Sequence, residues 1–221
     1  MNLEGKIINF LGDSITEGVG VSEELSNRYD NIVKRKCKLK EVYNYGISGT
    51  RMAHQSVPSD NPANDLCFCC RVYKLNPNAD ITIVFGGTND YGHGEAPFGN
   101  IDDKTPKTFC GAVDYMMNTL PKLYPNMKFV FMTPARRNDD ERPSQDPIKK
   151  SDALPLKNYS EIIKEKGQEY GIPVLDLYEN LGINPNDEQE RESYAPDGLH
   201  FNSEGHKKIA DCLIKFLNDL D

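Results

Sequence analysis

The chain has 221 residues, of which 38% are hydrophobic and 27% are charged, and its formal net charge is −8. This composition is typical of a soluble globular protein, and we interpret residues 1–221 as one domain that can bury a sizeable core. The acidic balance argues against nucleic acid or an anionic membrane as a partner, because both need clustered Lys and Arg. The basic stretch Lys34–Lys40 is interpreted as a solvated helix end.

The residues Met1–Lys6 lead straight into an apolar stretch and do not form a signal-peptide pattern. No apolar run reaches the roughly 18 residues that a membrane-spanning helix needs. We therefore expect a cytoplasmic protein that has no membrane partner and whose six cysteines are free thiols.

Five apolar, strand-like runs alternate with helical stretches along the chain. The predicted strands are Lys6–Leu11, Glu41–Tyr45, Asp80–Phe85, Lys128–Thr133 and Ile172–Leu177. The predicted helices are Glu23–Lys36, Asp65–Leu75, Lys107–Leu123, Pro155–Tyr170 and Ser203–Asn218, the last capped by Asn202 or Ser203. Strands that are apolar on both faces are typical of a parallel sheet covered by helices on both sides. The pattern predicts an α/β fold, a three-layer α/β/α sandwich.

Two connections are longer than this architecture needs. They are Tyr91–Pro106 and Pro134–Leu154, and each follows the end of a predicted strand. Both are expected to lie over the same edge of the sheet. Long loops in a compact domain are often functional, so either loop could act as a lid.

Ser14 is the first candidate nucleophile. It stands in Gly12-Asp13-Ser14, directly after the first predicted strand. Such a turn lifts a hydroxyl to the carboxyl edge of the sheet, which is where open α/β sheets bind their ligands. A serine hydroxyl needs a base to take its proton at neutral pH, and that base is most often histidine.

Of the four histidines, His200 has the most suitable surroundings. It closes the turn Asp197-Gly198-Leu199-His200, in which the carboxylate can hold Nδ1 and leave Nε2 free. His54 and His93 lie in polar loops and are not favoured as the base, and His206 lies inside the last predicted helix, where it is expected to face solvent or an end of the core. Taken alone, an Asp-x-x-His turn is more often a surface turn with a helix-capping role than a catalytic one.

Two further turns carry hydrogen-bond donors. Gly49 follows the second strand and would allow a backbone N–H to approach a substrate oxygen closely. Asn89 follows the third strand in Gly86-Gly87-Thr88-Asn89-Asp90 and can aim its amide into the same crevice. Together with the backbone N–H of Ser14, these donors would form an oxyanion hole.

The order of these four motifs, from Lys6 to the last helix, resembles that of the SGNH hydrolases, also called the GDSL esterase/lipase family. The resemblance implies a flavodoxin-like fold with a five-stranded parallel sheet. It departs from the family pattern at Ile15, which stands where the name-giving motif has Leu. The exchange is between apolar side chains and leaves the chemistry untouched.

The resemblance also implies a role for each matching residue. Ser14 would be the nucleophile, His200 the general base and then the acid, and Asp197 the group that orients it. Ser14, Gly49 and Asn89 would supply the oxyanion hole. Asp13 and Asp90 are interpreted as residues that hold their turns rather than as catalysts.

The expected reaction is hydrolysis of a small-molecule acyl ester through an acyl-enzyme, without a cofactor. The absence of long apolar flaps favours a short acyl group such as acetyl, and the resemblance implies a carbohydrate or small-metabolite esterase before a lipase. Because Trp is absent, Tyr29, Tyr91 or Tyr194 would have to stack on a sugar. Arg136 and Arg137 could instead bind an anionic group, or be solvated loop charges.

Three alternatives remain open. A lysophospholipase or thioesterase would use the same residues on another acyl ester. A carbohydrate-binding module without activity could share the fold. A nucleotide-binding protein is disfavoured, because neither Gly-x-Gly-x-x-Gly nor a P-loop motif occurs.

The cysteine cluster Cys67-Phe68-Cys69-Cys70 is the remaining candidate for chemistry. Its spacing does not match a zinc knuckle built from two Cys pairs, and no histidine lies beside it in sequence. We interpret Cys67, Cys69 and Cys70 as small packing residues on a helix and expect no metal.

Overall fold

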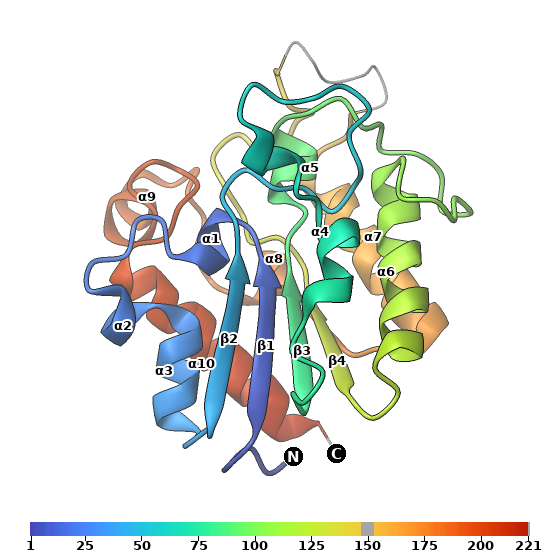
Figure 1. The fold of residues 1–221 in the computed structure, drawn as a ribbon. Coiled ribbons are helices and arrows are strands. Elements are labelled where there is room, and N and C mark those ends of the chain that lie inside the picture. The colour runs from blue at the N-terminus through green and yellow to red at the C-terminus, as the bar shows by residue number, and fades with distance from the viewer. Residues whose placement is uncertain (147–152, 221) are drawn as a thin grey trace.

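A single twisted sheet with helices on both faces forms the fold of this computed structural model, which describes residues 1–146 and 153–220 (Figure 1). The five strands are β1 (Ile7–Gly12), β2 (Glu41–Gly46), β3 (Ile81–Phe85), β4 (Lys128–Met132) and β5 (Val174–Leu175). All neighbours are parallel, in the order β2-β1-β3-β4-β5. This is the flavodoxin-like strand order, so the predicted α/β sandwich is confirmed.

The helices connect the strands and cover both faces of the sheet. They are α1 (Ser14–Glu17), α2 (Glu24–Asn27), α3 (Tyr29–Lys36), α4 (Phe68–Arg71), α5 (Thr88–Gly92), α6 (Phe109–Leu123), α7 (Leu156–Tyr170), α8 (Leu177–Asn180), α9 (Glu188–Tyr194) and α10 (Ser203–Asp219), with 3-10 turns η1 (Pro62–Asp65) and η2 (Val72–Lys74). None of the helices in the described ranges has the length and apolar character needed to cross a bilayer.

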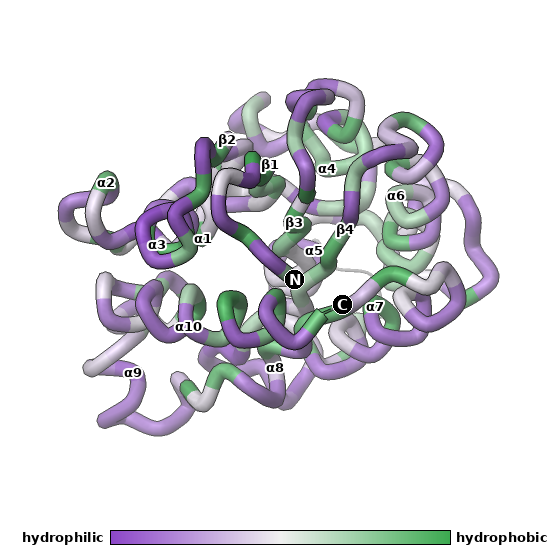
Figure 2. The backbone as a smooth tube through the Cα atoms, turned by 90° about the horizontal axis from the view of Figure 1, so that it is seen from below, coloured by the Kyte–Doolittle hydropathy of each residue, from purple (hydrophilic) through white to green (hydrophobic). Residues whose placement is uncertain are grey.

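Alternation along the strands divides the core into two halves. Ile81, Ile83 and Phe85 of β3 pack with α3 and α10, whereas Val84 packs with α6 and α7 on the opposite face. In Figure 2 the strands accordingly lie between α10 and α6. The inner strands β1, β3 and β4 are buried on both faces, which leaves the carboxyl edge of the sheet as the place for a site.

Several predicted elements differ in extent. The predicted helix Glu23–Lys36 is broken at Arg28, which is extended (φ −69°, ψ 139°) and pairs with Asp30. The predicted strand Ile172–Leu177 retains only the two residues of β5. Because β5 is a short edge strand, its apolar run has fewer partners to hold it in the ladder than the inner strands have.

The predicted helix Asp65–Leu75 is also wrong as one element, because η1, α4 and η2 divide it. The helix α9 is missing from the sequence prediction. By contrast, Asn202 caps α10 as expected, since its side chain accepts the backbone N–H groups of Glu204 and Gly205.

Candidate active site

Three polar side chains from opposite ends of the chain meet at the carboxyl edge of the sheet. Ser14 follows β1 and opens α1, a turn that Asp13 fixes by accepting the backbone N–H of Ile15 at 3.0 Å. Ser14 Oγ lies 2.9 Å from His200 Nε2, and His200 Nδ1 lies 2.6 Å from Asp197 Oδ2. The structure therefore brings together the serine, histidine and aspartate that the sequence singled out.

The turn from Asp197 to His200 is held by its own first residue. Asp197 Oδ1 accepts the backbone N–H groups of Leu199 at 2.9 Å and His200 at 2.7 Å. Burial raises the pKa of Asp197, but the hydrogen bonds from His200 and Leu199 outweigh it and hold this pKa below its usual value. The aspartate is thus ionised at neutral pH.

The protons in this chain follow from the chemistry of the carboxylate. An ionised aspartate only accepts hydrogen bonds, so Nδ1 of His200 carries the ring proton toward Asp197. Nε2 is then an acceptor, and the hydroxyl of Ser14 donates to it. This arrangement can remove the proton from the serine hydroxyl.

Asp13 itself lies beneath this group. Its side chain is buried, and burial raises its pKa to about 6 against the lowering effects of the Ile15 N–H, His200 and Arg71. It touches the backbone of the Ser14 turn and therefore acts on the position of Ser14.

The segments that follow β2 and β3 carry the predicted oxyanion donors. Gly49 has φ +72°, and a Cβ there would lie 2.5 Å from the side-chain oxygen of Asn64. Asn89 donates one amide hydrogen to the carbonyl of Thr50 at 2.9 Å, which leaves its second amide hydrogen available. Because β2 and β3 flank β1, these turns lie on either side of the turn that carries Ser14.

Asp90 and Arg71 hold this region together. Asp90 accepts the backbone N–H groups of Met52 and Ala53, each at 2.9 Å, as a turn-holding residue would. Arg71 donates to the carbonyl of Gly12 at 3.0 Å, to Thr50 Oγ1 at 2.8 Å and to the carbonyl of Tyr45. Arg71 is not among the predicted site residues, because it bonds to segments distant in sequence and no motif reports such contacts.

His93 is a second residue that the sequence analysis passed over. Its Nδ1 lies 2.9 Å from Arg51 Nη1, and its Nε2 lies 3.2 Å from Asn89 Oδ1. Because a guanidinium only donates, Nδ1 must accept and Nε2 must carry the proton. His93 therefore donates to Asn89 Oδ1 and fixes which way the Asn89 amide points. The spacing of four residues from Asn89 is the signal that could have found it.

The predicted substrate residues are placed in different surroundings. Arg137 and Tyr91 line a hollow of about 250 Å³ beside Asp197, with the Arg137 guanidinium 5.4 Å from the centre of the Tyr91 ring. The Tyr91 hydroxyl donates to the carbonyls of Asp139 at 2.8 Å and Arg142 at 3.0 Å. The hydroxyl hydrogen of Tyr91 is therefore used in bonds to main-chain carbonyls.

Arg136 and Tyr194 do not join this hollow. Arg136 pairs with Asp140 at 3.1 Å and with Glu141 at 2.6 Å, so two carboxylates balance its charge. Tyr194 lies at the end of α9 with Lys208 Nζ 4.4 Å from its ring centre. Roles for these residues in binding remain predictions.

One aromatic side chain and one histidine are more buried than a site residue or a solvent-facing residue would be. Tyr29 cannot stack on a substrate, because it is fully buried and its hydroxyl pairs with Thr16 at 2.9 Å. Of the two positions expected for His206, the solvent-facing one is wrong, because His206 is fully buried and its Nδ1 accepts the backbone N–H of Tyr29 at 3.2 Å. Burial lowers the pKa of His206 to about 4.

The two long loops touch each other and the histidine turn. The Ser144 hydroxyl donates to the carbonyl of Gly92 at 2.8 Å, and the N–H of Asn138 donates to the carbonyl of Gly198 at 2.7 Å. The predicted lid loop 134–154 includes residues 147–152, which lie outside the described residues. A lid movement of either loop remains a prediction.

The cysteine cluster also differs from the expectation. Cys67 and Cys69 are buried as packing residues would be, but Cys70 is exposed. His54, although distant in sequence, lies beside Cys67 and Cys70 in space. This group lies apart from Ser14 and is taken up below.

A family model described as the GDSL-like Lipase/Acylhydrolase family matches residues 10–208 of the chain. The chain belongs to this family. Family membership assigns this GDSL-like protein to the hydrolases that act on acyl esters. No curated protein matches its sequence.

Solved structures share the GDSL-like fold over nearly the whole chain. A protein from Lactobacillus plantarum has 28% sequence identity and a TM-score of 0.83, with 99% of each chain covered. A lipase/acylhydrolase from Enterococcus faecalis has 22% identity and a TM-score of 0.63, covering 95% of this chain and 94% of its own. An acetyl-xylooligosaccharide esterase from Geobacillus has 19% identity and a TM-score of 0.62, covering 100% and 98%.

Proposed function

We propose that the protein is a serine esterase that removes a short acyl group, such as acetyl, from a carbohydrate or another small polar molecule. The observation that carries this proposal is the continuous chain of hydrogen bonds from Asp197 through His200 to Ser14, with distances of 2.6 and 2.9 Å. The family match supports the ester hydrolase class.

The proposed reaction has two acyl-transfer steps. His200 Nε2 takes the proton of Ser14 as Oγ attacks the ester carbonyl carbon, and Asp197 stabilises the imidazolium that forms. The tetrahedral intermediate collapses, the leaving alkoxide receives the proton from His200, and an acyl-serine remains. Water then attacks the acyl-serine with His200 as its base. Collapse of the second intermediate releases the carboxylic acid and restores Ser14.

The negative oxygen of each tetrahedral intermediate needs donors that are already oriented. We assign the backbone N–H groups of Ser14 and Gly49 and the second amide hydrogen of Asn89 to this role. The fixed orientation of the Asn89 amide, set by Thr50 and His93, supports the assignment. Donors held in advance cost no reorganisation when the charge develops.

The surroundings of the site favour a small polar substrate over a long acyl chain. A hollow of about 490 Å³ includes Asn64, which touches Gly49, and His93, which touches Asn89. Most of the residues that line it are of polar or charged type, among them Gln55, Ser59, Asp60, Asn61 and Glu95. An apolar hollow lined by Met1, Phe129 and Leu220 lies at the opposite, amino-terminal ends of the strands and is out of reach of Ser14.

The first test is the Ser14→Ala variant with p-nitrophenyl acetate as substrate. We expect kcat/KM to fall by about 10⁴-fold or more, because the nucleophile is lost, while the melting temperature stays close to that of the wild type. Ser22→Ala is the matched control, because Ser22 is an exposed serine paired with Ser203. Activity of Ser14→Ala near the wild-type level would refute the proposal.

An acyl-chain series tests the substrate class separately. Turnover of p-nitrophenyl esters is expected to fall steadily from acetate to palmitate. A maximum at long chains would favour the lysophospholipase or thioesterase alternative. A protein with no turnover of any ester, but with binding to oligosaccharides, would be the carbohydrate-binding module.

A further inference from the structure

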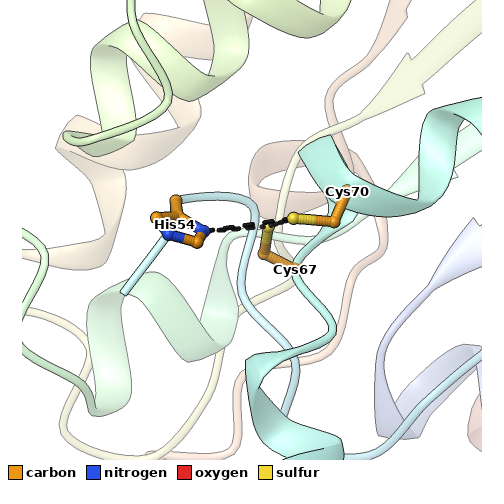
Figure 3. Close-up of side chains that lie close together, drawn as sticks. All are labelled: His54, Cys67 and Cys70. Atoms are coloured by element: carbon orange, nitrogen blue, oxygen red, sulfur yellow. Dashed lines mark hydrogen bonds between the residues drawn. The ribbon is translucent and has the colours of Figure 1, made fainter. Parts of the chain in front are cut away.

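Three side chains that can bind a metal converge at the amino-terminal end of α4. Cys67 Sγ and Cys70 Sγ are 2.8 Å apart, and His54 Nδ1 is 4.0 Å from each sulfur. Figure 3 shows the His54 ring facing the two sulfurs from the loop that follows β2. The three ligand atoms lie within 4.8 Å of one another.

We propose that His54, Cys67 and Cys70 bind a zinc ion, with a fourth position open to water. Two sulfurs and one imidazole nitrogen are the donors that Zn²⁺ takes in proteins, and Mg²⁺ or Ca²⁺ would need oxygen ligands instead. This site is separate from the triad, and the proposal is independent of the proposed esterase activity.

The geometry needs only small side-chain movements to become tetrahedral. Bond lengths of about 2.3 Å for Zn–S and 2.0–2.1 Å for Zn–N imply S···S and S···N separations of roughly 3.6–3.8 Å. The sulfurs at 2.8 Å must therefore separate by about 1 Å, and His54 at 4.0 Å must approach by a few tenths of an ångström. His54 and Cys70 are exposed, so both side chains have room to turn.

The main chain around the ligands is fixed without the ion. The N–H of His54 donates to the carbonyl of Pro106 at 2.6 Å, and the two residues before it are held by Asp90. The carbonyl of Cys67 accepts the N–H groups of Cys70 at 3.1 Å and Arg71 at 3.2 Å. A site whose ligands are already held in place loses less conformational entropy on binding.

The ion would link the two ends of the segment 55–66, because one ligand precedes this segment and another follows it. His54 and Cys67 flank this segment, which contains Asn64, the residue packed against Gly49. Closing a loop in this way removes conformations from the unfolded and locally opened chain. We assign the ion a structural role, in which it protects this loop from opening.

A disulfide between Cys67 and Cys70 is the competing interpretation of the two sulfurs. Both are free thiols in the structure, and a disulfide would give His54 no part. The two interpretations differ in what they predict for His54→Ala. Loss of the imidazole weakens a zinc site, whereas it leaves a disulfide intact.

The test measures metal binding to the full chain, purified with a reductant and stripped with a chelator. With added Zn²⁺ we expect one ion per chain by elemental analysis, and with Co²⁺ a thiolate-to-cobalt absorption band. At 100 times the dissociation constant, zinc is expected to raise the melting temperature by about 5–10 °C and to slow proteolysis within residues 55–66.

Variants make the test specific. His54→Ala and Cys70→Ser should each weaken zinc binding by about 100-fold or more, since loss of a direct ligand exceeds the 10- to 100-fold effect of an outer partner. Cys212→Ser, which alters a free thiol on α10, is the matched control and should bind as the wild type does. Metal-free circular dichroism checks that each variant is folded.

Three results would overturn the proposal. They are the absence of a zinc-dependent shift in the reduced wild type, equal zinc affinity of His54→Ala and the wild type, and a Cys67–Cys70 disulfide that persists when zinc is present in excess. Each of these outcomes leaves the esterase proposal unaffected, because none of the measurements uses catalytic activity.

Discussion

The two sides of Ser14 are held in place in different ways. Asp197 and His200 form an exposed turn, in which the Asp197 side chain is 55% exposed and is bonded mainly to residues of the turn itself. Thr50, Asn89 and Asp90 on the other side are each at most 4% exposed, and their bonds are made to buried main-chain groups: Asn89 donates to the Thr50 carbonyl, and Asp90 accepts the N–H groups of Met52 and Ala53. Changes in the first region should therefore alter chemistry alone, and changes in the second should alter both chemistry and stability.

Asp197→Asn tests the exposed side and has the largest expected effect. The amide would favour the wrong ring tautomer of His200, and kcat is expected to fall by about 10⁴-fold. The melting temperature should change by only a few degrees, because the amide oxygen can still accept the N–H groups of Leu199 and His200. The kcat is measured with p-nitrophenyl acetate as substrate, and the melting temperature is measured by thermal unfolding. A large loss of stability would contradict the expectation that changes in the exposed turn alter the chemistry alone.

Asn89→Ala tests the buried side. Removing one oxyanion donor typically lowers kcat by about 10²–10³-fold. The carbonyl of Thr50 also loses its donor, so the free energy of unfolding should drop by about 1–3 kcal/mol. Urea unfolding and steady-state kinetics give the two values. An unchanged stability would show that the buried network is less coupled than its hydrogen bonds indicate.

His93→Ala tests the same buried region at a residue that acts on the substrate only through Asn89. His93 orients Asn89 without being placed in the oxyanion hole, so its loss should lower kcat by about 5- to 10-fold, the equivalent of one hydrogen bond. KM should change little. His93→Gln, which keeps a donor, should restore part of the activity. A fall in kcat as large as that of Asn89→Ala would assign His93 a direct role.

His206→Gln tests a buried group outside the triad and has the smallest expected effect on activity. With a folded pKa near 4 and an unfolded pKa near 6.5, the unfolded chain binds more protons in this window, so His206 makes stability fall as the pH drops from about 6.5 to 4. Between pH 7.5 and 5 this amounts to about 2 kcal/mol, which the variant should lack.

The wild type has to be compared with the His206→Gln variant, because Asp13 changes the free energy of unfolding with pH in the opposite direction to His206. Its pKa is raised from 3.8 to about 6, so its contribution to stability falls as the pH rises through that window. Denaturant unfolding of wild type and His206→Gln at both pH values separates the two groups. Parallel pH dependence in the two proteins would contradict the buried neutral state of His206.

The predictions that succeeded rest on local patterns. Strands β1, β3 and β4 are apolar runs, and the turns at Ser14, Gly49, Asn89 and Asp197 follow strands or precede a helix cap, which is why the sequence could place them at one edge of the sheet. The cap at Asn202 likewise depends only on its neighbours in the chain.

What could not be predicted depends on contacts between distant segments. The bond from Arg51 to His93, the approach of His54 to Cys67 and Cys70, and the burial of His206 beneath Tyr29 each join residues on separate elements. Arg28 breaks a helix whose flanking pattern is helical, because its guanidinium pairs with Asp30 in the folded protein. Periodicity and motif spacing do not report such pairs.

The most direct measurement of the central claim is covalent labelling with a fluorophosphonate, followed by mass spectrometry of the peptides. The account predicts one label per chain, located on Ser14, with labelling strongly slowed in His200→Ala and absent in Ser14→Ala. Labelling at another serine, or equal labelling of the wild type and His200→Ala, would contradict the assignment of Ser14 as the nucleophile activated by His200.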